Sequence, residues 1–554
     1  MYTVERYTIP EVIEKSSLYY DERPALSMVG GRAIRYRELE PLTRRIAALL
    51  GLLGIAKGER VAILSESRPE WGLAYFGIAR SGAIAVPIMM DFLPEQVAAI
   101  LEHSESRLVF VSKRFLPKVE AEGEKRIVVS LEDFTVLAAP GGSLERAKSA
   151  IEGAALDAAA TSFAPPKIEA DELASILYTS GTMGKSKGVM LTHRNLVFDA
   201  VGARKFIVLR RTDRLLSILP LAHAYEFTIG FLIPILQGSA VYYLDRPPSA
   251  TALLPALAAV RPTVMLSVPL VIEKVYRSSV QPSLEKIGLY KVKLFKPLLE
   301  RIAGIKLYKI FGGKLRFFGL GGAPVAADVE SFLHNARFPY SIGYGLTETA
   351  PLIAGNKPGK VLVHTTGFPS GGVELRIADP RPDTGEGEIQ ARGKNVFPGY
   401  YKDPERTAEA FSADHWFRTG DLGVMDKKGR VTVRGRLKTM ILGASGENIY
   451  PEEIEALLNS SPLVLESLVY GDEKGLTALV NLKPEVLERI KSRVKDEIEG
   501  VEVGLAETLE RIKREANGRL QAFSRINRVE HQVEPFEKTP KQSIKRFLYP
   551  MKRK

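Results

Sequence analysis

Residues 176–190 read ILYTSGTMGKSKGVM, and they carry the densest chemical signal in this chain of 554 residues. An apolar run stops at a loop that holds hydroxyls (Thr179, Ser180, Thr182), glycines (Gly181, Gly184, Gly188) and lysines (Lys185, Lys187). Glycines let backbone N–H groups approach an anion, while hydroxyls and lysines add hydrogen bonds and positive charge. The loop is therefore predicted to bind a polyphosphate.

Two other motifs fit this loop less well. Residues 184–186 end like a Walker A loop, but the first glycine of that motif would fall at Thr179. Residues 184–188 also fit the G-x-S-x-G nucleophile elbow, whose serine follows a strand directly. Here eight loop-type residues precede Lys187, and no histidine is placed to activate Ser186. We therefore set the serine-hydrolase interpretation aside. It predicts that a fluorophosphonate labels Ser186, which we do not expect.

Strand-like and helix-like patterns alternate on the N-terminal side of the loop. Short apolar runs occur at 61–64, 83–87, 108–111 and 127–129, with helical spacing at 36–53 and 71–80. This alternation predicts a parallel sheet flanked by helices. Further expectations are a loop within 139–166, a small antiparallel β unit at 367–417, and a second compact unit after Arg434 with a charged helix at 484–520.

Composition excludes several classes of chemistry. The chain has no cysteine, so disulfides, thiol nucleophiles and cysteine-ligated metals are ruled out. The seven histidines have no paired ligand spacing, which argues against a histidine-built metal site. The longest uncharged run, 227–244, contains Gly230, Pro234, Gln237 and Gly238, and reads as a buried strand–helix passage rather than a membrane span. We expect a soluble, cytoplasmic protein.

The segment 274–316 is markedly basic, with eleven lysines and arginines against Glu285 and Glu300. Together with a net charge of +12, it favours anionic partners. A solvated helix face is the usual explanation of such a run, and we favour it. The alternative is a surface that sits on an anionic membrane, because apolar residues interleave at helical spacing.

Four later segments fit a phosphate site. They are GLGGAP at 319–324, SIGYGLTET at 341–349, WFRTGDLG at 416–423 and GRLKTMILGASGENIYPEEIE at 435–455. A carboxylate near phosphates is repulsive unless a divalent cation lies between them, so Glu348 suggests Mg²⁺. Asp421, which we expect on a turn, could accept hydrogen bonds from two ribose hydroxyls. Each segment alone could be a plain turn, whereas their order and spacing together indicate one nucleotide site.

From about Leu39 to Arg546 the sequence resembles the adenylate-forming, AMP-binding superfamily. Within it, LPLAHAYE at 219–226 and SGENIYPEE at 445–453 are most similar to long-chain fatty-acid–CoA ligases. The resemblance implies an α/β fold: a large N-terminal domain of parallel and mixed sheets with flanking helices and a small β unit, then a small, mobile α+β C-terminal domain. The implied domains are 1–435 and 436–554, with a hinge near Lys438.

The resemblance also implies the site. The β- and γ-phosphates of ATP would be held by Thr179, Ser180, Gly181, Thr182, Gly184 and Lys187, and Mg²⁺ by Thr179 and Glu348. Thr347 would contact the α-phosphate, and the adenine would be flanked by Gly322, Ala323, Pro324, Gly343 and Tyr344. Asp421 and Arg436 would bind the ribose. His223 would orient the substrate carboxylate or close the acyl pocket, unless it is a core histidine with satisfied hydrogen bonds.

The implied activity joins a fatty acid to AMP and then to CoA, with ATP, CoA and Mg²⁺ as co-substrates and cofactor. The apolar stretch 227–236 suits a lipid tail, and Ala224 stands where amino-acid-activating relatives place an aspartate. An aryl–CoA ligase or a ligase for a carrier protein stays open. So do chain length, a homodimer and peripheral membrane contact. We expect no nucleic-acid partner.

One departure from the family pattern concerns the C-terminal motif T-P-x-G-K-I-x-R. Here it reads TPKQSIKR at 539–546, so the motif lysine is Ser543. In an extended segment, Lys541 and Lys545 would face the same side as Ser543 and could supply the charge. Otherwise adenylation would be impaired, which leaves open a nucleotide-binding protein without turnover.

Overall fold

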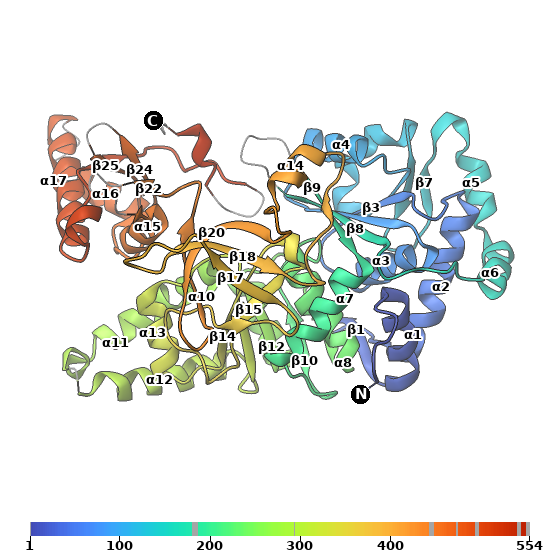
Figure 1. Ribbon diagram of the computed structural model, residues 1–554, viewed down its shortest axis with the longest axis horizontal. Coiled ribbons are helices and arrows are strands. Elements are labelled where there is room, and N and C mark those ends of the chain that lie inside the picture. The colour runs from blue at the N-terminus through green and yellow to red at the C-terminus, as the bar shows by residue number, and fades with distance from the viewer. Residues whose placement is uncertain are drawn as a thin grey trace.

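The computed structural model describes residues 2–179, 187–292, 294–442, 448–472, 475–493, 498–539 and 544–549. These residues form two large sheets, a four-stranded sheet and a C-terminal α+β region, which Figure 1 shows at the upper left. The predicted fold class, α/β with large N-terminal sheets and a small C-terminal domain, is confirmed. Among the described residues, no helix is both long and apolar enough to cross a membrane.

The sheet that carries the phosphate loop has eight strands in the order β19-β9-β8-β4-β3-β5-β6-β7. Its strands are β3 (Arg60–Leu64), β4 (Ile84–Ile88), β5 (Leu108–Val111), β6 (Ile127–Ser130), β7 (Val136–Ala138), β8 (Leu173–Thr179), β9 (Lys187–Thr192) and β19 (Gly399–Tyr400). The pairs around β3 are parallel, and β7, β9 and β19 join antiparallel. The apolar runs of the sequence are therefore strands, as predicted.

Five helices belong to this part of the chain: α2 (Tyr36–Leu52), α3 (Pro69–Ser81), α4 (Pro94–His103), α5 (Leu144–Ala150) and α6 (Gly153–Ser162). Helix α3 begins with Pro69, whose fixed φ suits a first turn, and ends at Gly82, whose φ of 77° is the left-handed value that glycine tolerates. The segment 139–166 carries the expected loop at 163–166, but residues 144–150 and 153–162 are helical, because alanine is a strong helix former.

The second large sheet has nine strands in the order β16-β15-β14-β13-β12-β10-β11-β1-β2. They are β1 (Pro24–Met28), β2 (Ile34–Arg35), β10 (Arg214–Ser217), β11 (Ala240–Tyr243), β12 (Val264–Ser267), β13 (Phe317–Leu320), β14 (Tyr340–Gly345), β15 (Leu352–Gly355) and β16 (Phe368–Pro369). The other helices before the small sheet are α1 (Ile9–Tyr20), α7 (His193–Gly202), α8 (Ile233–Gln237), α9 (Ala250–Val260), α10 (Pro269–Val275), α11 (Gln281–Glu285), α12 (Lys296–Ile310) and α13 (Ala327–Asn335). Helix α1 packs on α2 and α3, and α7 contacts β8 and β9. One buried apolar cluster joins both large sheets.

The uncharged run 227–244 is buried, as predicted, but the helix comes before the strand. It begins in a π-helix, Glu226–Leu232, continues as α8 and ends in β11. A second π-helix, Tyr276–Val280, joins α10 to α11. Within the run, Phe231 and Ile233 are fully buried.

A small antiparallel sheet follows, as the sequence predicts, but it extends beyond the expected range 367–417 to Arg436. Its order is β17 (Glu374–Ala378), β18 (Gly387–Arg392), β20 (Phe417–Met425) and β21 (Val431–Arg436), and α14 (Pro404–Glu409) lies between β18 and β20 in the chain. The strands pair antiparallel throughout. In Figure 1 this sheet lies between the large sheets and the C-terminal region.

The C-terminal region contains β22 (Ile441–Leu442), β23 (Asn448–Ile449), α15 (Pro451–Asn459), β24 (Val464–Asp472), β25 (Gly475–Leu482), α16 (Pro484–Arg493), α17 (Ile498–Asn517) and β26 (Arg528–His531). A single helix over 484–520 is wrong. A Cβ on Gly504 would lie 3.0 Å from Ile490 Cγ2, whereas fourteen residues along one helix span about 20 Å. Helices α16 and α17 therefore pack against each other.

Candidate functional site

The carboxyl end of β8 opens the candidate site. Thr179 is the last residue of β8 and pairs in register with Lys187, the first of β9. The Thr179 hydroxyl is buried and has no hydrogen-bond partner among the described residues. Ligands of open α/β sheets bind outside the carboxyl ends of the strands, so this orphaned hydroxyl stands where a ligand is expected. Ser180, Gly181, Thr182 and Gly184 lie outside the described residues.

Lys187 joins this strand end to Glu348. Its Nζ lies 2.6 Å from Glu348 Oε1 and donates a 2.8 Å hydrogen bond to the Tyr400 hydroxyl, which in turn donates to the same Oε1 at 2.9 Å. Burial alone would raise the pKa of Glu348, but the Lys187 charge and the two hydrogen bonds outweigh it, so its pKa lies below the ordinary value. Glu348 is thus held ionised in a buried position.

Backbone hydrogen bonds hold Glu348 where Lys187 reaches it. Glu348 lies in the single 3₁₀ turn Thr347–Thr349 that follows β14. Phe397 N donates to Glu348 O at 2.9 Å, and Asn395 Nδ2 donates to Thr349 O at 2.9 Å. The segment that carries Asn395, Phe397 and Tyr400 therefore fixes the turn and also supplies the hydroxyl on Glu348.

The donor set fits Mg²⁺. Both hydrogen bonds to Glu348 end on Oε1, so Oε2 takes part in neither. The buried Thr179 hydroxyl adds a second oxygen on the strand end that pairs with Lys187. Among the described residues no group of three His, Asp or Glu forms an all-protein cage. Mg²⁺ in nucleotide sites takes one or two protein oxygens and completes its shell with phosphates and water.

Asp421, which is predicted to bind the ribose, lies within strand β20 and not on the turn expected from the sequence. It faces Arg436 across the β20–β21 ladder, and Arg436 Nε lies 2.8 Å from Oδ1. The Tyr344 hydroxyl donates to Oδ2 at 2.7 Å. Burial raises the pKa of Asp421 and is only partly offset by Arg436 and Tyr344, while the Glu348 charge raises it further. That coupling places the two carboxylates in one electrostatic environment.

The glycine-rich turn 319–324 lies against Tyr225 and Gly343, close to the Tyr344 that hydrogen-bonds to Asp421. A Cβ on Gly321 would lie 3.2 Å from the Tyr225 ring and 3.6 Å from Gly343 O. Gly322, with a φ of 84°, is exposed together with Ala323 and Pro324. The turn, the end of β14 and the loop before the Glu226–Leu232 π-helix therefore meet at one place, and their role in flanking an adenine stays a prediction.

His223 stands in that loop and is half-buried. The Tyr225 backbone N donates to His223 Nδ1 at 3.2 Å, so the neutral ring carries its proton on Nε2. Ser67 fixes the loop, because its hydroxyl donates to Leu219 O and accepts from Leu221 N, both at 3.0 Å. The acceptor role at Nδ1 is compatible both with a ligand at Nε2 and with a core histidine.

The stretch expected to border an acyl tail is packed with aromatic rings. Phe227 lies 4.3 Å from the Tyr75 ring centroid, and Phe231 lies 4.8 Å from Phe76. Trp71 stacks on Tyr75 at 5.6 Å. Beside them Glu226 is buried, and the Ser217 hydroxyl donates to its Oε1 at 2.5 Å. The surroundings are apolar, with one buried carboxyl group.

The described residues of the C-terminal motif at 539–546 form ion pairs with carboxylates outside the candidate site. Lys545 Nζ lies 3.1 Å from Glu537 Oε2, and Arg546 pairs with Glu455 of α15. Lys541 and Ser543 lie outside the described residues. Lys438 is exposed just after β21. The described part of this motif therefore makes its ion pairs within the C-terminal region rather than with Glu348.

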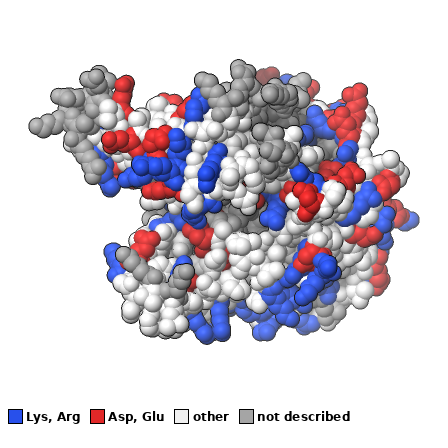
Figure 2. Space-filling model, turned by 60° about the vertical axis from the view of Figure 1, so that its left-hand side comes forward, with Lys and Arg blue, Asp and Glu red and all other residues white. Residues whose placement is uncertain are grey.

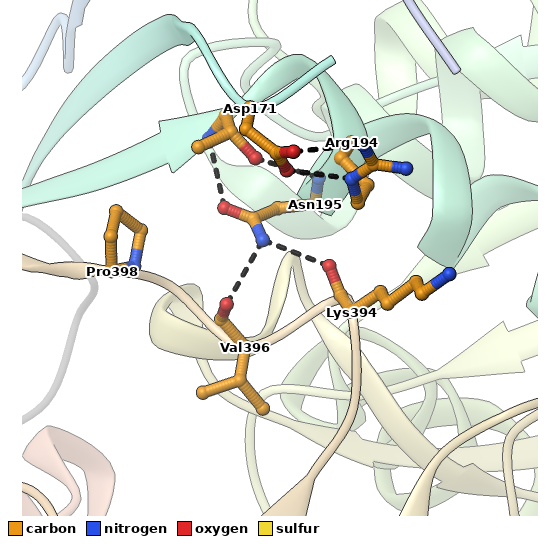
Figure 3. Close-up of a pocket in the computed structure, with 7 residues that line it drawn as sticks. Asp171, Arg194, Asn195, Lys394, Val396 and Pro398 are labelled. Carbon is orange, nitrogen blue, oxygen red and sulfur yellow. Dashed lines mark hydrogen bonds and ion pairs between the residues drawn. The ribbon is translucent and has the colours of Figure 1, made fainter. Parts of the chain in front are cut away.

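A cavity of about 580 Å³, lined by Asp171, Thr192 and Asn195, lies at the end of the β8–β9 pair opposite to Thr179 and contains no predicted site residue. Figure 3 shows Asn195 in its wall, donating to Lys394 O and Val396 O at 2.9 Å each, with Arg194 paired to Asp171. Asn195 thus anchors the segment that leads to Tyr400. Neither Tyr400 nor Asn195 was singled out from the sequence: β19 has two residues, and Tyr400 is 213 positions from Lys187.

Comparison with known proteins adds four findings. Residues 13–401 match the family described as AMP-binding enzyme, and residues 438–549 match its C-terminal domain. The long-chain-fatty-acid–CoA ligase FadD15 of Mycobacterium bovis is 34% identical over 475 residues, covering 81% of this chain and 77% of that protein. A feruloyl-CoA synthase of Amycolatopsis is 31% identical over 451 residues, covering 80% and 81%. ATP-bound MatB from Rhodopseudomonas palustris shares the fold, with a TM-score of 0.74 and 24% identity over 98% of both chains.

Proposed function

Because this chain belongs to the family of adenylate-forming, AMP-binding enzymes, we propose that it activates a long-chain fatty acid with ATP and passes the acyl group to CoA. In the first step a carboxylate oxygen of the acid attacks the α-phosphorus of ATP, and pyrophosphate leaves. In the second step the CoA thiolate attacks the acyl carbonyl, and AMP leaves. Neither step needs a protein nucleophile, so catalysis depends on position and charge.

The observation that carries the proposal is the group formed by Thr179, Lys187 and Glu348 at the carboxyl end of β8. Lys187 keeps Glu348 ionised, the form that can ligate a cation. Thr179 and Glu348 would hold Mg²⁺, which when bound neutralises charge on the phosphates. Thr347, next to Glu348, would then contact the α-phosphate, with Ser180, Gly181, Thr182 and Gly184 around the outer phosphates.

The remaining residues would place nucleoside and acid. Asp421 and Arg436 would bind the ribose, and the 322–324 turn with Gly343 and Tyr344 would flank the adenine. His223, in the loop that leads into the buried aromatic segment, would orient the acid. Lys438 would be the hinge about which the C-terminal region, 436–554, turns between the two steps.

A fatty acid is favoured because the FadD15 relative covers most of the chain and the segment after His223 is apolar. An aryl acid is the second candidate, since the feruloyl-CoA synthase has similar identity and coverage and since aromatic rings crowd Phe227. The two candidate functions differ in which acid, fatty or aryl, makes the enzyme release AMP from ATP.

The test is AMP release from MgATP with palmitate, octanoate, benzoate or ferulate, each with and without CoA. A long-chain ligase releases AMP fastest with palmitate and CoA. Faster turnover of benzoate or ferulate would replace the fatty acid by an aryl substrate. Nucleotide binding without acid-dependent AMP formation would mean that Ser543 has cost the protein its adenylation step.

A further inference from the structure

Helix α12 and the turn before it expose an unusual number of large apolar side chains. Leu294 is 82% exposed, Leu298 57% and Ile305 52%, and the exposed set also includes Ile287, Leu289, Val292, Phe295, Ile302 and Ile310. Leu298, Ile302 and Ile305 are spaced by four and three residues, so they form one stripe on the helix. An exposed apolar patch of this kind marks an interaction surface.

The opposite side of α12 is fixed to the fold. Glu300 is buried, accepts 2.9 Å and 2.8 Å hydrogen bonds from Tyr290 and Asn335, and so ties the helix to the preceding turn and to α13. A Cβ on Gly304 would lie 2.5 Å from Ala336 Cβ, so the helix backbone lies directly on the end of α13. The apolar stripe is therefore held outward by a packed and hydrogen-bonded face.

Positive charge surrounds this stripe. Arg301 and Lys306 lie on its two sides, and Lys309 continues it by one turn beyond Ile305. All three are exposed, and within the described residues none of them pairs with a carboxylate. Figure 2 brings this side forward: the lobe below the C-terminal region is mostly uncharged, with Lys and Arg at its left and lower edges and Asp and Glu at its upper edge.

We propose that the stripe formed by Leu298, Ile302 and Ile305, with Arg301, Lys306 and Lys309 around it, docks on the surface of an anionic lipid bilayer. Apolar side chains that enter the acyl boundary beneath basic side chains at the headgroups are the arrangement of interfacial helices. A second copy of the chain fits poorly, because two such faces would oppose their lysines and arginines. Docking needs no turnover, so it stands apart from the proposed activity.

The test is flotation of the full chain with vesicles of phosphatidylcholine and phosphatidylglycerol at a molar ratio of about 7:3. The wild type binds these vesicles, binds phosphatidylcholine vesicles at least about tenfold less, and is released by about 0.5 M NaCl only in part, because the apolar contact is not screened. The double variant Ile302→Glu/Ile305→Glu loses binding at least about tenfold. Arg301→Glu/Lys306→Glu does the same.

The matched control is Leu18→Glu, which places a carboxylate on the exposed outer face of α1, where Leu18 is 77% exposed. It keeps full vesicle binding, and unchanged thermal unfolding midpoints show that all variants are folded. Failure of the wild type to bind anionic vesicles would overturn the proposal. Vesicle binding that survives in the Ile302→Glu/Ile305→Glu variant would also overturn it. The same holds if the wild type is a dimer and the Ile302→Glu/Ile305→Glu variant is a monomer.

Discussion

Lys187 links the strand end at Thr179 to the carboxylate of Glu348, although 161 positions separate the two charges in the chain. Glu348 retains only 8% of its side-chain exposure, whereas Lys187 retains 23%. Removing one member of a buried ion pair leaves the other without compensation, which costs far more than the pair contributes. The carboxylate is the more deeply buried partner, so loss of Lys187 is the more damaging change.

Replacing Lys187 by Met should lower the free energy of unfolding by about 3 kcal/mol near neutral pH. In the wild type the pKa of Glu348 is lowered, so its stabilisation is present above the ordinary carboxyl range and is lost as pH falls through that lowered pKa. Without Lys187, burial raises the pKa of Glu348. The loss in free energy of unfolding relative to the wild type therefore grows as pH rises. Urea unfolding near pH 4 and near pH 7.5 measures both.

The control for this change is Arg194→Met. Arg194 pairs with Asp171, whose side chain is 74% exposed, so its loss should change the free energy of unfolding by less than about 1 kcal/mol at either pH. An equal, pH-independent deficit in Lys187→Met and Arg194→Met would contradict the buried-pair account.

Asp421 carries the second prediction at this scale. Asp421→Asn should weaken AMP binding about tenfold in calorimetry, because the carboxylate accepts ribose hydroxyls more strongly than an amide does. Since the pKa of Asp421 is raised, wild-type affinity should also fall earlier on acidification than that of an ordinary aspartate site. Asp414→Asn, at an exposed aspartate paired with Arg376, should leave AMP affinity unchanged. Equal affinities for wild type and Asp421→Asn would remove Asp421 from the site.

The sequence predicted the residues that chemistry names directly. Thr179, Glu348 and Asp421 were identified from hydroxyl, carboxylate and glycine patterns. In the structure Thr179 ends β8, Glu348 lies in the turn after β14, and Asp421 lies within β20, where the Tyr344 hydroxyl of β14 donates to it. Tyr400 was missed because its contact depends on the long-range pairing of β19 with β9. Their functional roles stay predictions, as do those of Ser180, Gly181, Thr182 and Gly184.

Helix and strand boundaries were predicted correctly where the local sequence pattern determines them, and the predictions failed where tertiary packing does. Strands β3 to β6 were predicted because they are continuous apolar runs, as expected for strands covered on both faces. Helices α5 and α6 were missed because glycine and proline at their ends suggested a loop. The pairing of α16 with α17 depends on tertiary contact, which no helical pattern reports.

The π-helix Glu226–Leu232 shows an element that periodicity cannot predict. Its carboxyl group lies over Gly230, where an added Cβ would be 2.6 Å from Glu226 Cδ. Burial raises the pKa of Glu226 to about 8, with the Ser217 hydrogen bond acting against it. The native state thus favours the protonated form, and the penalty for ionisation appears as pH rises from the unfolded value toward 8.

Glu226→Gln should therefore stabilise the protein at alkaline pH. The gain above about pH 8 should be on the order of 5 kcal/mol and should vanish near pH 4, where the carboxyl group is protonated in both the native and the unfolded state. Thermal unfolding at the two pH values measures it. Glu95→Gln, on the exposed first turn of α4, serves as the control and should show no such trend. A Glu226→Gln variant less stable than the wild type at both pH values would contradict this pKa.

For the whole molecule, the C-terminal region rests on the small β sheet through a few polar contacts. Asn448 donates to Glu386 Oε2 at 2.8 Å, and Arg381 donates to Asn448 Oδ1 at 3.3 Å. Small polar interfaces within a chain allow relative domain motion. A hinge near Lys438 agrees with these contacts and remains a prediction.

Ser543→Lys tests the departure in the C-terminal motif. Restoring the lysine should raise the rate of acid-dependent ATP–pyrophosphate exchange, by about tenfold or more if no neighbour supplies the charge. Ser543→Gln lengthens the side chain without charge and is the matched control. An unchanged rate in Ser543→Lys would mean that Lys541 or Lys545 already serves. Lys545→Met, which removes the partner of Glu537, would then lower the rate if Lys545 serves, and Lys541→Met would lower it if Lys541 serves.

Single turnover with α-labelled MgATP, palmitate and excess enzyme, in the absence of CoA, tests the acid-activation chemistry most directly. The account predicts enzyme-bound palmitoyl-AMP with an equal amount of pyrophosphate, and its conversion to palmitoyl-CoA and AMP when CoA is added. Formation of ADP, or of AMP at the same rate without any acid, would contradict it.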